Sequence, residues 1–109
     1  MKRNKYYNKK CIYKDMIFDS IKERNHYIIL EQLQKTGQIS RLQCQVKFEL
    51  QPKFVINGKT IRPITYIADF TYIKDGKLVV VDTKGFRTDV YKLKKKMFEY
   101  QYKIEIKEV

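Results

Sequence analysis

The chain has 109 residues, enough for one domain, and its 43% of hydrophobic residues indicate a folded globular protein rather than a disordered one. Its 24 Lys and Arg against 12 Asp and Glu give a net charge of +12, which favours a polyanionic partner, with nucleic acid expected. No apolar run could span a bilayer and no signal peptide is recognisable, so we expect a cytoplasmic protein that does not bind membranes.

Residues 1–10 are expected to form a flexible basic arm ahead of a single domain over residues 11–109. A second basic group falls in the carboxyl-terminal third of the chain. We expect these two groups to contact phosphates, with a merely soluble basic surface as the alternative. The residues assigned to this contact are Lys2, Arg3, Lys5, Lys9, Lys10, Arg87, Lys92, Lys95 and Lys96.

The amino-terminal third predicts a ribbon and then a helix. Residues 11–18 alternate loosely and indicate a short ribbon that turns at Lys14-Asp15. Ser20-Ile21-Lys22-Glu23 has the form of a capping box, so a helix should begin at Ser20 and end near Lys35, with Gly37 as a carboxyl-terminal cap. Glu23 heads the helix stripe that otherwise faces the core.

The rest of the chain predicts mainly strands. Residues 42–50 alternate as a half-buried strand, and residues 54–64 form a hairpin broken at Asn57-Gly58. The segments 66–74 and 77–84 form another hairpin. Thr88 should cap a helix over residues 89–102 with Val90, Leu93 and Met97 as its apolar stripe, followed by an edge strand over residues 103–108 that pairs in parallel.

The hairpin turn at Asp75-Gly76 decides where two acids lie. A two-residue turn places Asp69 directly opposite Asp82 with Cβ atoms roughly 5 Å apart, whereas a three-residue turn with a bulge places them diagonally. Opposed carboxylates destabilise a sheet unless a divalent cation lies between them. The side-chain period of two places Lys84 on the same face as Asp82 in either register.

The order of elements and these acids resemble the PD-(D/E)XK nuclease superfamily, and more closely a group of small phage-encoded endonuclease-like proteins within it. The resemblance implies an α/β fold with a restriction-endonuclease-like core, in which a mixed, mostly antiparallel sheet is flanked by helices in the order helix, three or more strands, helix, strand. The matching stretches are Phe18-Asp19-Ser20-x-x-Glu23, Leu50-Gln51-Pro52-x-Phe54, Tyr66-Ile67-Ala68-Asp69-Phe70 and Val81-Asp82-Thr83-Lys84-Gly85.

The resemblance implies catalytic roles for four residues. Asp69 and Asp82 match the first and second metal-binding acids, Glu23 matches the helix acid that many members add to the metal shell, and Lys84 matches the family's lysine. Gln51 is assigned a supporting role. The chain departs from the family where an alanine rather than a proline precedes the first acid, and where the second acid is an aspartate, although glutamate is commoner.

The implied function is a DNA endonuclease that uses Mg²⁺, with Mn²⁺ as a substitute, and cuts branched, junction or weakly specific sites, because so small a domain has little room for base-reading loops. RNA is not excluded as a substrate. Concerted cutting of two strands requires two active sites and hence a homodimer, whereas a monomer should nick. A phage or prophage protein acting in a bacterial host is expected.

Simpler interpretations stay open for each residue. Glu23 can act only as a helix cap, Asp69 can pair with Arg62, and Asp82 with Lys84 can be a surface ion pair. A nucleic-acid-binding module without catalysis is the main alternative function. A phage protein that binds an acidic protein partner is a further one.

Overall fold

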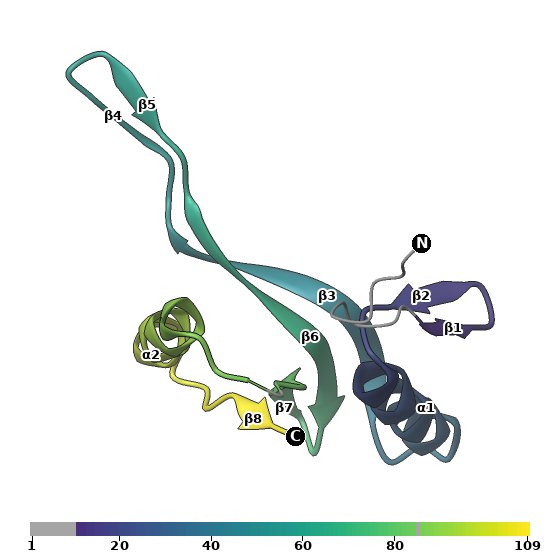
Figure 1. The fold of residues 1–109 in the computed structure, drawn as a ribbon. Coiled ribbons are helices and arrows are strands. Elements are labelled where there is room, and N and C mark those ends of the chain that lie inside the picture. Colours follow the sequence, from purple (N-terminus) through teal and green to yellow (C-terminus); the bar gives the residue numbers. More distant parts are fainter. Residues whose placement is uncertain (1–10, 85) are drawn as a thin grey trace, which may run out of the picture.

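The structure, a computed structural model, describes residues 11–84 and 86–109 (Figure 1). The predicted arm over residues 1–10 and Gly85 lie outside the described residues. Five of the residues assigned to phosphate contact therefore also lie outside them, namely Lys2, Arg3, Lys5, Lys9 and Lys10.

The main sheet has four strands in the order β3-β6-β7-β8. Strands β3 (Ser40–Gln51), β6 (Ile64–Lys74) and β7 (Lys77–Asp82) pair antiparallel, whereas β8 (Lys107–Glu108) pairs parallel to β7. The predicted α/β class with a mixed, mostly antiparallel sheet is confirmed, and so is the parallel pairing of the final strand. That strand is shorter than the predicted range of residues 103–108.

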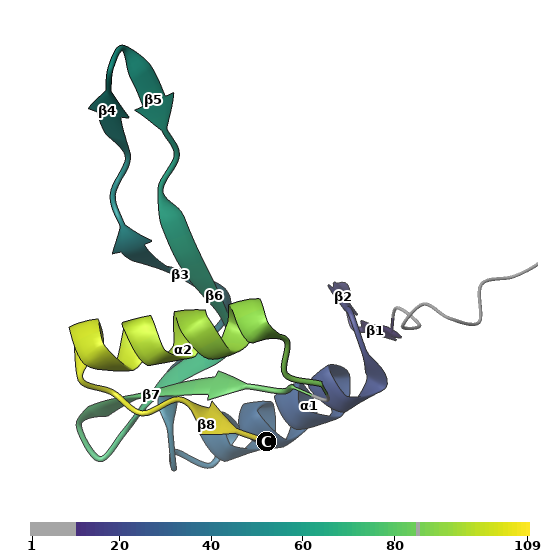
Figure 2. The same cartoon turned by 60° about the vertical axis from the view of Figure 1, so that its left-hand side comes forward.

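The helices α1 (Ile21–Lys35) and α2 (Asp89–Tyr102) lie on opposite sides of the β6–β7 pair (Figures 1 and 2). Each helix packs on its own apolar cluster, and β6 and β7 contribute residues to both clusters. Leu30 of α1 packs with Phe70, while Phe98 of α2 packs with Tyr66. The two clusters clamp the hairpin that carries the candidate acids.

The predicted boundaries of α1 are confirmed by its capping contacts. Ser20 Oγ accepts a hydrogen bond from the Glu23 amide at 3.0 Å. The helix ends at Lys35, one position ahead of the Thr36 cap, and Gly37 follows with a φ of +82°. Glycine adopts this left-handed conformation without steric cost, so it closes the helix in a Schellman-like turn.

Helix α2 begins and ends where the sequence predicts, but its buried face is not the predicted one. Val90 and Leu93 are 61% and 58% exposed, whereas Tyr91 and Phe98 are buried. The aromatic side chains face the core because each buries more apolar area than valine or leucine. The Tyr91 hydroxyl also donates a hydrogen bond to Glu108 Oε2 at 2.7 Å. The predicted apolar stripe of α2 is therefore wrong, apart from its partly buried Met97.

Two further hairpins extend from the body. Strands β1 (Cys11–Tyr13) and β2 (Met16–Phe18) form the predicted amino-terminal ribbon beside α1. Strands β4 (Phe54–Ile56) and β5 (Lys59–Ile61) form the predicted hairpin, which projects away from the main sheet (Figures 1 and 2).

The corrected face of α2 makes a stability prediction. Phe98→Ala should lower the free energy of unfolding by about 3–5 kcal/mol, because it leaves a cavity where a fully buried ring packs against Phe48 and Tyr102. Leu93→Ala should cost less than about 1 kcal/mol, because that side chain is exposed. Urea unfolding followed by circular dichroism measures both. A larger loss of unfolding free energy for Leu93→Ala than for Phe98→Ala would instead support the apolar stripe predicted from the sequence.

Candidate active site

The register of the β6–β7 hairpin is the one expected for a two-residue turn. The paired residues run from Lys74 opposite Lys77 to Phe70 opposite Val81. Asp75 and Gly76 both have positive φ, as a type I′ turn requires. The bulged alternative is therefore wrong.

Asp69 and Asp82 lie one position beyond the Phe70–Val81 pair, at the end of the hairpin away from its turn. Asp69 Oδ2 accepts hydrogen bonds from the Thr83 amide at 2.8 Å and from Thr83 Oγ1 at 2.7 Å. The Asp69 carboxylate is thus anchored on the chain segment that follows β7. The interpretation of Asp69 as a partner of Arg62 is not supported by these contacts.

The Asp82 carboxylate is fully buried and only partly satisfied. Tyr66 Oη donates a hydrogen bond to Oδ2 at 2.6 Å, whereas Oδ1 has no hydrogen-bond partner among the described residues. Lys84 Nζ lies 3.5 Å from Oδ1, a distance for ion pairing rather than for a hydrogen bond of good geometry. Burial raises the pKa of Asp82, the nearby charge of Asp69 adds to this, and the contacts with Tyr66 and Lys84 oppose it.

Glu23 faces the same region from the first turn of α1. Its side chain is nearly buried, and Oε2 accepts a hydrogen bond from Gln45 Nε2 at 2.9 Å. Burial raises the pKa of Glu23 to about 7, helped by the negative charges of Asp69 and Asp19. Ser20 caps the helix through the Glu23 backbone amide, while the Glu23 carboxylate accepts its hydrogen bond from Gln45.

Gln45 was not predicted, yet it connects two of the candidate acids. Its Nε2 lies 2.9 Å from Glu23 Oε2 and 3.4 Å from Asp69 Oδ1. Its backbone has a φ of +53° in the middle of β3, while Cys44 and Val46 on either side keep their register with β6. A non-glycine residue in this conformation is strained and persists only where its surroundings hold it. In the sequence it reads only as a polar, outward residue of an alternating strand.

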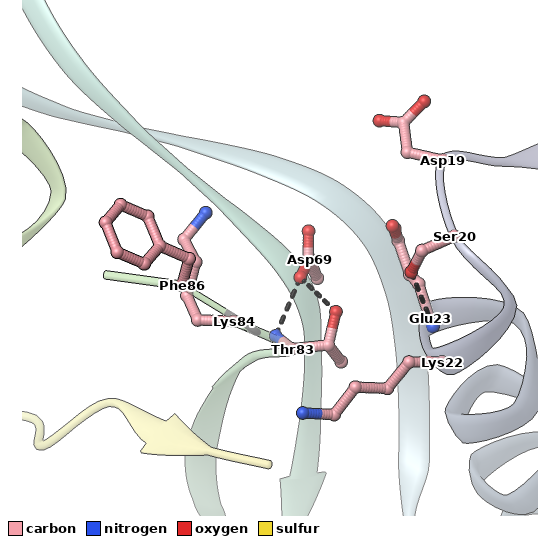
Figure 3. A pocket seen from close by; sticks show the side chains of 8 residues that line it. All are labelled: Asp19, Ser20, Lys22, Glu23, Asp69, Thr83, Lys84 and Phe86. Atoms are coloured by element: carbon pink, nitrogen blue, oxygen red, sulfur yellow. Dashed lines mark hydrogen bonds between the residues drawn. The ribbon is translucent and has the colours of Figure 1, made fainter. Parts of the chain in front are cut away.

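A cavity of about 560 Å³ lies between the start of α1, the middle of β6 and the segment that follows β7 (Figure 3). The side chains that line it come from three separate parts of the chain. They are Asp19, Ser20, Lys22, Glu23, Asp69, Thr83, Lys84 and Phe86. Asp82 is too deeply buried to line the cavity, but its ion-pair partner Lys84 lines it. The cavity therefore combines carboxylates with two lysines.

The fit of this site to a metal ion depends on the chemistry of its oxygens. Carboxylates are the ligands that Mg²⁺ prefers, and Asp82 Oδ1 is a buried oxygen that still has bonding capacity. Among residues 11–84 and 86–109, however, no three His, Cys, Asp or Glu side chains are grouped closely enough to hold a metal ion as they stand. The residue types fit a magnesium site, and their arrangement requires side-chain movement on binding.

Two assigned residues, Gln51 with a supporting role and Arg87 with a phosphate contact, do not line the cavity. Gln51 lies near the far end of β3, opposite Ile64, and is not among the cavity residues, so its supporting role is not borne out by position. Arg87 is held by Glu108 through Nη2 at 2.8 Å and Nε at 3.0 Å, so its charge is already paired.

The basic cluster on α2 is partly available. Lys95 pairs with Glu99 at 2.9 Å, whereas Lys92 and Lys96 are exposed. Lys84 also lines a second cavity of about 250 Å³, which contains Lys94. The lysine of the site thus lies between the acidic cavity and a smaller one beside α2.

The profile of one protein family matches residues 3–108, and the chain belongs to that family, which is described as "Protein of unknown function (DUF1064)". No curated protein and no solved structure matches the chain. In the part of the chain that the structure describes, neither helix is long and apolar enough to cross a membrane.

The raised pKa of Glu23 makes a pH-dependent prediction. The unfolded chain releases the Glu23 proton near 4.5, whereas the folded protein holds it until about pH 7, so the Glu23 contribution to stability falls as pH rises through this window. Glu23→Gln removes that contribution. The variant should exceed the wild type in free energy of unfolding by up to about 3 kcal/mol at pH 8, and by much less at pH 4.5.

Urea unfolding at pH 4.5, 6 and 8 measures this difference. Glu105→Gln, at an exposed glutamate, is the matched control and should run parallel to the wild type. Parallel curves for Glu23→Gln as well would show that the Glu23 carboxylate is not desolvated in the folded protein.

Proposed function

We propose that the protein is a metal-dependent DNA endonuclease that hydrolyses phosphodiester bonds. The observation that carries the proposal is the buried Asp82 carboxylate with one unsatisfied oxygen, next to Asp69 and Lys84 at one end of the hairpin. Supporting it, the elements α1, β3, β6, β7, α2 and β8 follow in the order helix, strands, helix, strand that the PD-(D/E)XK resemblance implies, and the last strand pairs in parallel.

A divalent cation explains why the carboxylates gather where their charges oppose each other. Burial and mutual repulsion raise the pKa of Glu23 and of Asp82, which is unfavourable for the ionised acids. Asp69, Asp82 and Glu23 would hold Mg²⁺ or Mn²⁺, and their opposing charges would then become favourable. When bound, the ion supplies charge neutralisation at the scissile phosphate and lowers the pKa of a water molecule.

The remaining side chains act on the substrate and on the acids. Lys84 and Lys22 line the cavity and would bind and orient the phosphate group. Thr83 fixes the Asp69 carboxylate, and Tyr66 fixes the buried oxygen of Asp82. By the resemblance, the products would carry a 5′-phosphate and a 3′-hydroxyl.

A non-catalytic nucleic-acid-binding module on the same fold is the second candidate. The observation that favours it is that the described acids do not form a ready metal-binding group. The exposed lysines of α2 would serve such a module equally well. Structure-specific cutting, DNA in preference to RNA, a homodimer for concerted cleavage, and action in the cytoplasm of a phage host remain predictions.

Cleavage assays test the enzyme directly. Labelled linear, single-stranded, flapped and four-way-junction DNA should be cut with Mg²⁺ or Mn²⁺ and not with EDTA. Asp82→Asn should lower the rate by at least about 100-fold, the scale of loss seen when an electrostatic group of an active site is removed. Asp75→Asn, the same change at an exposed turn aspartate, should cut like the wild type.

Retained binding to these DNAs without any cutting, in the wild type and Asp82→Asn alike, would contradict the enzyme and support the binding module. Cutting that survives in Asp82→Asn would place the active centre elsewhere in the protein.

Metal binding has its own readout. At pH 8, Mg²⁺ should raise the midpoint of thermal unfolding of the wild type, by the equivalent of about 2.7 kcal/mol when its concentration is 100 times the dissociation constant. Asp82→Asn and Glu23→Gln should show a smaller rise, and Asp75→Asn an unchanged one. Equal rises in all four proteins would indicate binding outside the proposed site.

A further inference from the structure

The hairpin of β4 and β5 and the two residues on either side of it, residues 52–63 in all, form an arm. This arm leaves the body where β3 ends and β6 begins (Figures 1 and 2). Its apolar side chains stay open to solvent. Phe54, Val55 and Ile56 are 42%, 66% and 53% exposed. A two-stranded ribbon is marginally stable alone, and clustered exposed apolar residues mark a binding surface. The arm therefore has the composition of a segment that contacts a partner.

The charge of the arm indicates what that partner is. The sequence contains no acidic residue between Glu49 and Asp69. The same stretch carries Lys53, Lys59 and Arg62, all exposed. An apolar ribbon whose only charged side chains are positive is complementary to a polyanion, and its charge opposes binding to a basic protein surface.

The shape of the arm selects among polyanions. The major groove of B-form DNA admits a two-stranded ribbon, whereas that of A-form RNA is too narrow for side chains to read. One face of the arm carries Phe54 and Ile56 opposite Ile61 and Lys59, and the other carries Val55 opposite Thr60. Apolar side chains on such a ribbon can contact thymine methyl groups while the basic residues reach phosphates.

The arm is continuous with the strand that carries the candidate site. β6 begins at Ile64, five residues before Asp69, or roughly 16 Å along an extended strand. The turn at Asn57-Gly58 lies roughly another 20 Å beyond. The tip can therefore lie at most about one helical turn of B-form DNA from the cavity.

We propose that the arm of residues 52–63 inserts into the major groove of duplex DNA, about one helical turn to one side of the phosphate held at the cavity. The inference rests on the proposed function only for the identity of the partner as DNA. Groove binding by the arm does not require cleavage. Its test is therefore made with a variant that is not expected to cut.

The experiment compares two triple variants in the Asp82→Asn background with EDTA present. The arm variant is Lys53→Ala/Lys59→Ala/Arg62→Ala, and the control is Lys35→Ala/Lys74→Ala/Lys77→Ala. Each removes three charges from exposed positions, and those of the control lie at the end of α1, at the far end of β6 and at the start of β7. Circular dichroism and thermal unfolding verify that both variants fold.

Binding to a labelled 30-base-pair DNA duplex is measured by fluorescence anisotropy from 50 to 300 mM salt. The arm variant should bind on the order of 100-fold more weakly at 0.1 M salt, and its slope of log Kd against log salt should fall by roughly 0.9 per lost phosphate contact. The control should keep most of its affinity. The substitutions of the arm variant should weaken binding to a duplex RNA of the same sequence much less than they weaken binding to the DNA.

Equal losses in the two triple variants would overturn the proposal, because the arm would then act only as part of a general positive charge. Unchanged DNA binding by the arm variant, with a shift from dimer to monomer in light scattering, would also overturn it and assign the arm to contact between copies of the chain. Failure of the nuclease proposal is distinguishable, since it appears as absent cleavage with arm-dependent binding retained.

Discussion

The buried carboxylate of Asp82 is the constraint on which the candidate site depends. A buried ionised group costs several kcal/mol unless hydrogen bonds and opposite charge compensate it, and here Tyr66 and Lys84 compensate only in part. The nearby carboxylates of Asp69 and Glu23 add like-charge repulsion to this cost. A fold that maintains this arrangement against its own stability resembles other functional sites, where acids are kept in place for a ligand.

Strands and a helix carry the three acids, and Thr83 in the segment after β7 orients the carboxylate of Asp69. The hairpin turn fixes the register of β6 and β7, and two apolar clusters clamp that hairpin from either side. The cap at Ser20 sets where α1 begins and so where Glu23 points. Gln45 completes the frame through a strained backbone in β3, and its two contacts join the helix acid to the strand acid. Strain of this kind is consistent with a site whose geometry matters more than its stability.

Local chemistry made much of this fold predictable from the sequence. The Asp75-Gly76 turn and the two helix caps act over a few residues, so the positions of Asp69, Glu23 and α2 followed from them. The buried face of α2 and the role of Gln45 depend on contacts between distant segments, which periodicity does not encode. Gln51 was assigned from a motif alone, and the strand carries it away from the cavity. Membership of the family does not indicate an activity, because the family itself is described as of unknown function.

The most direct test of a metal-dependent active site is a crystal structure with DNA and Mn²⁺, with the ion located by its anomalous scattering. We predict an anomalous peak bound by oxygens of Asp69 and Asp82, with a phosphate of the DNA within contact of Lys84. An anomalous peak elsewhere, or DNA bound at the cavity with the acids unchanged and no ion between them, would contradict it.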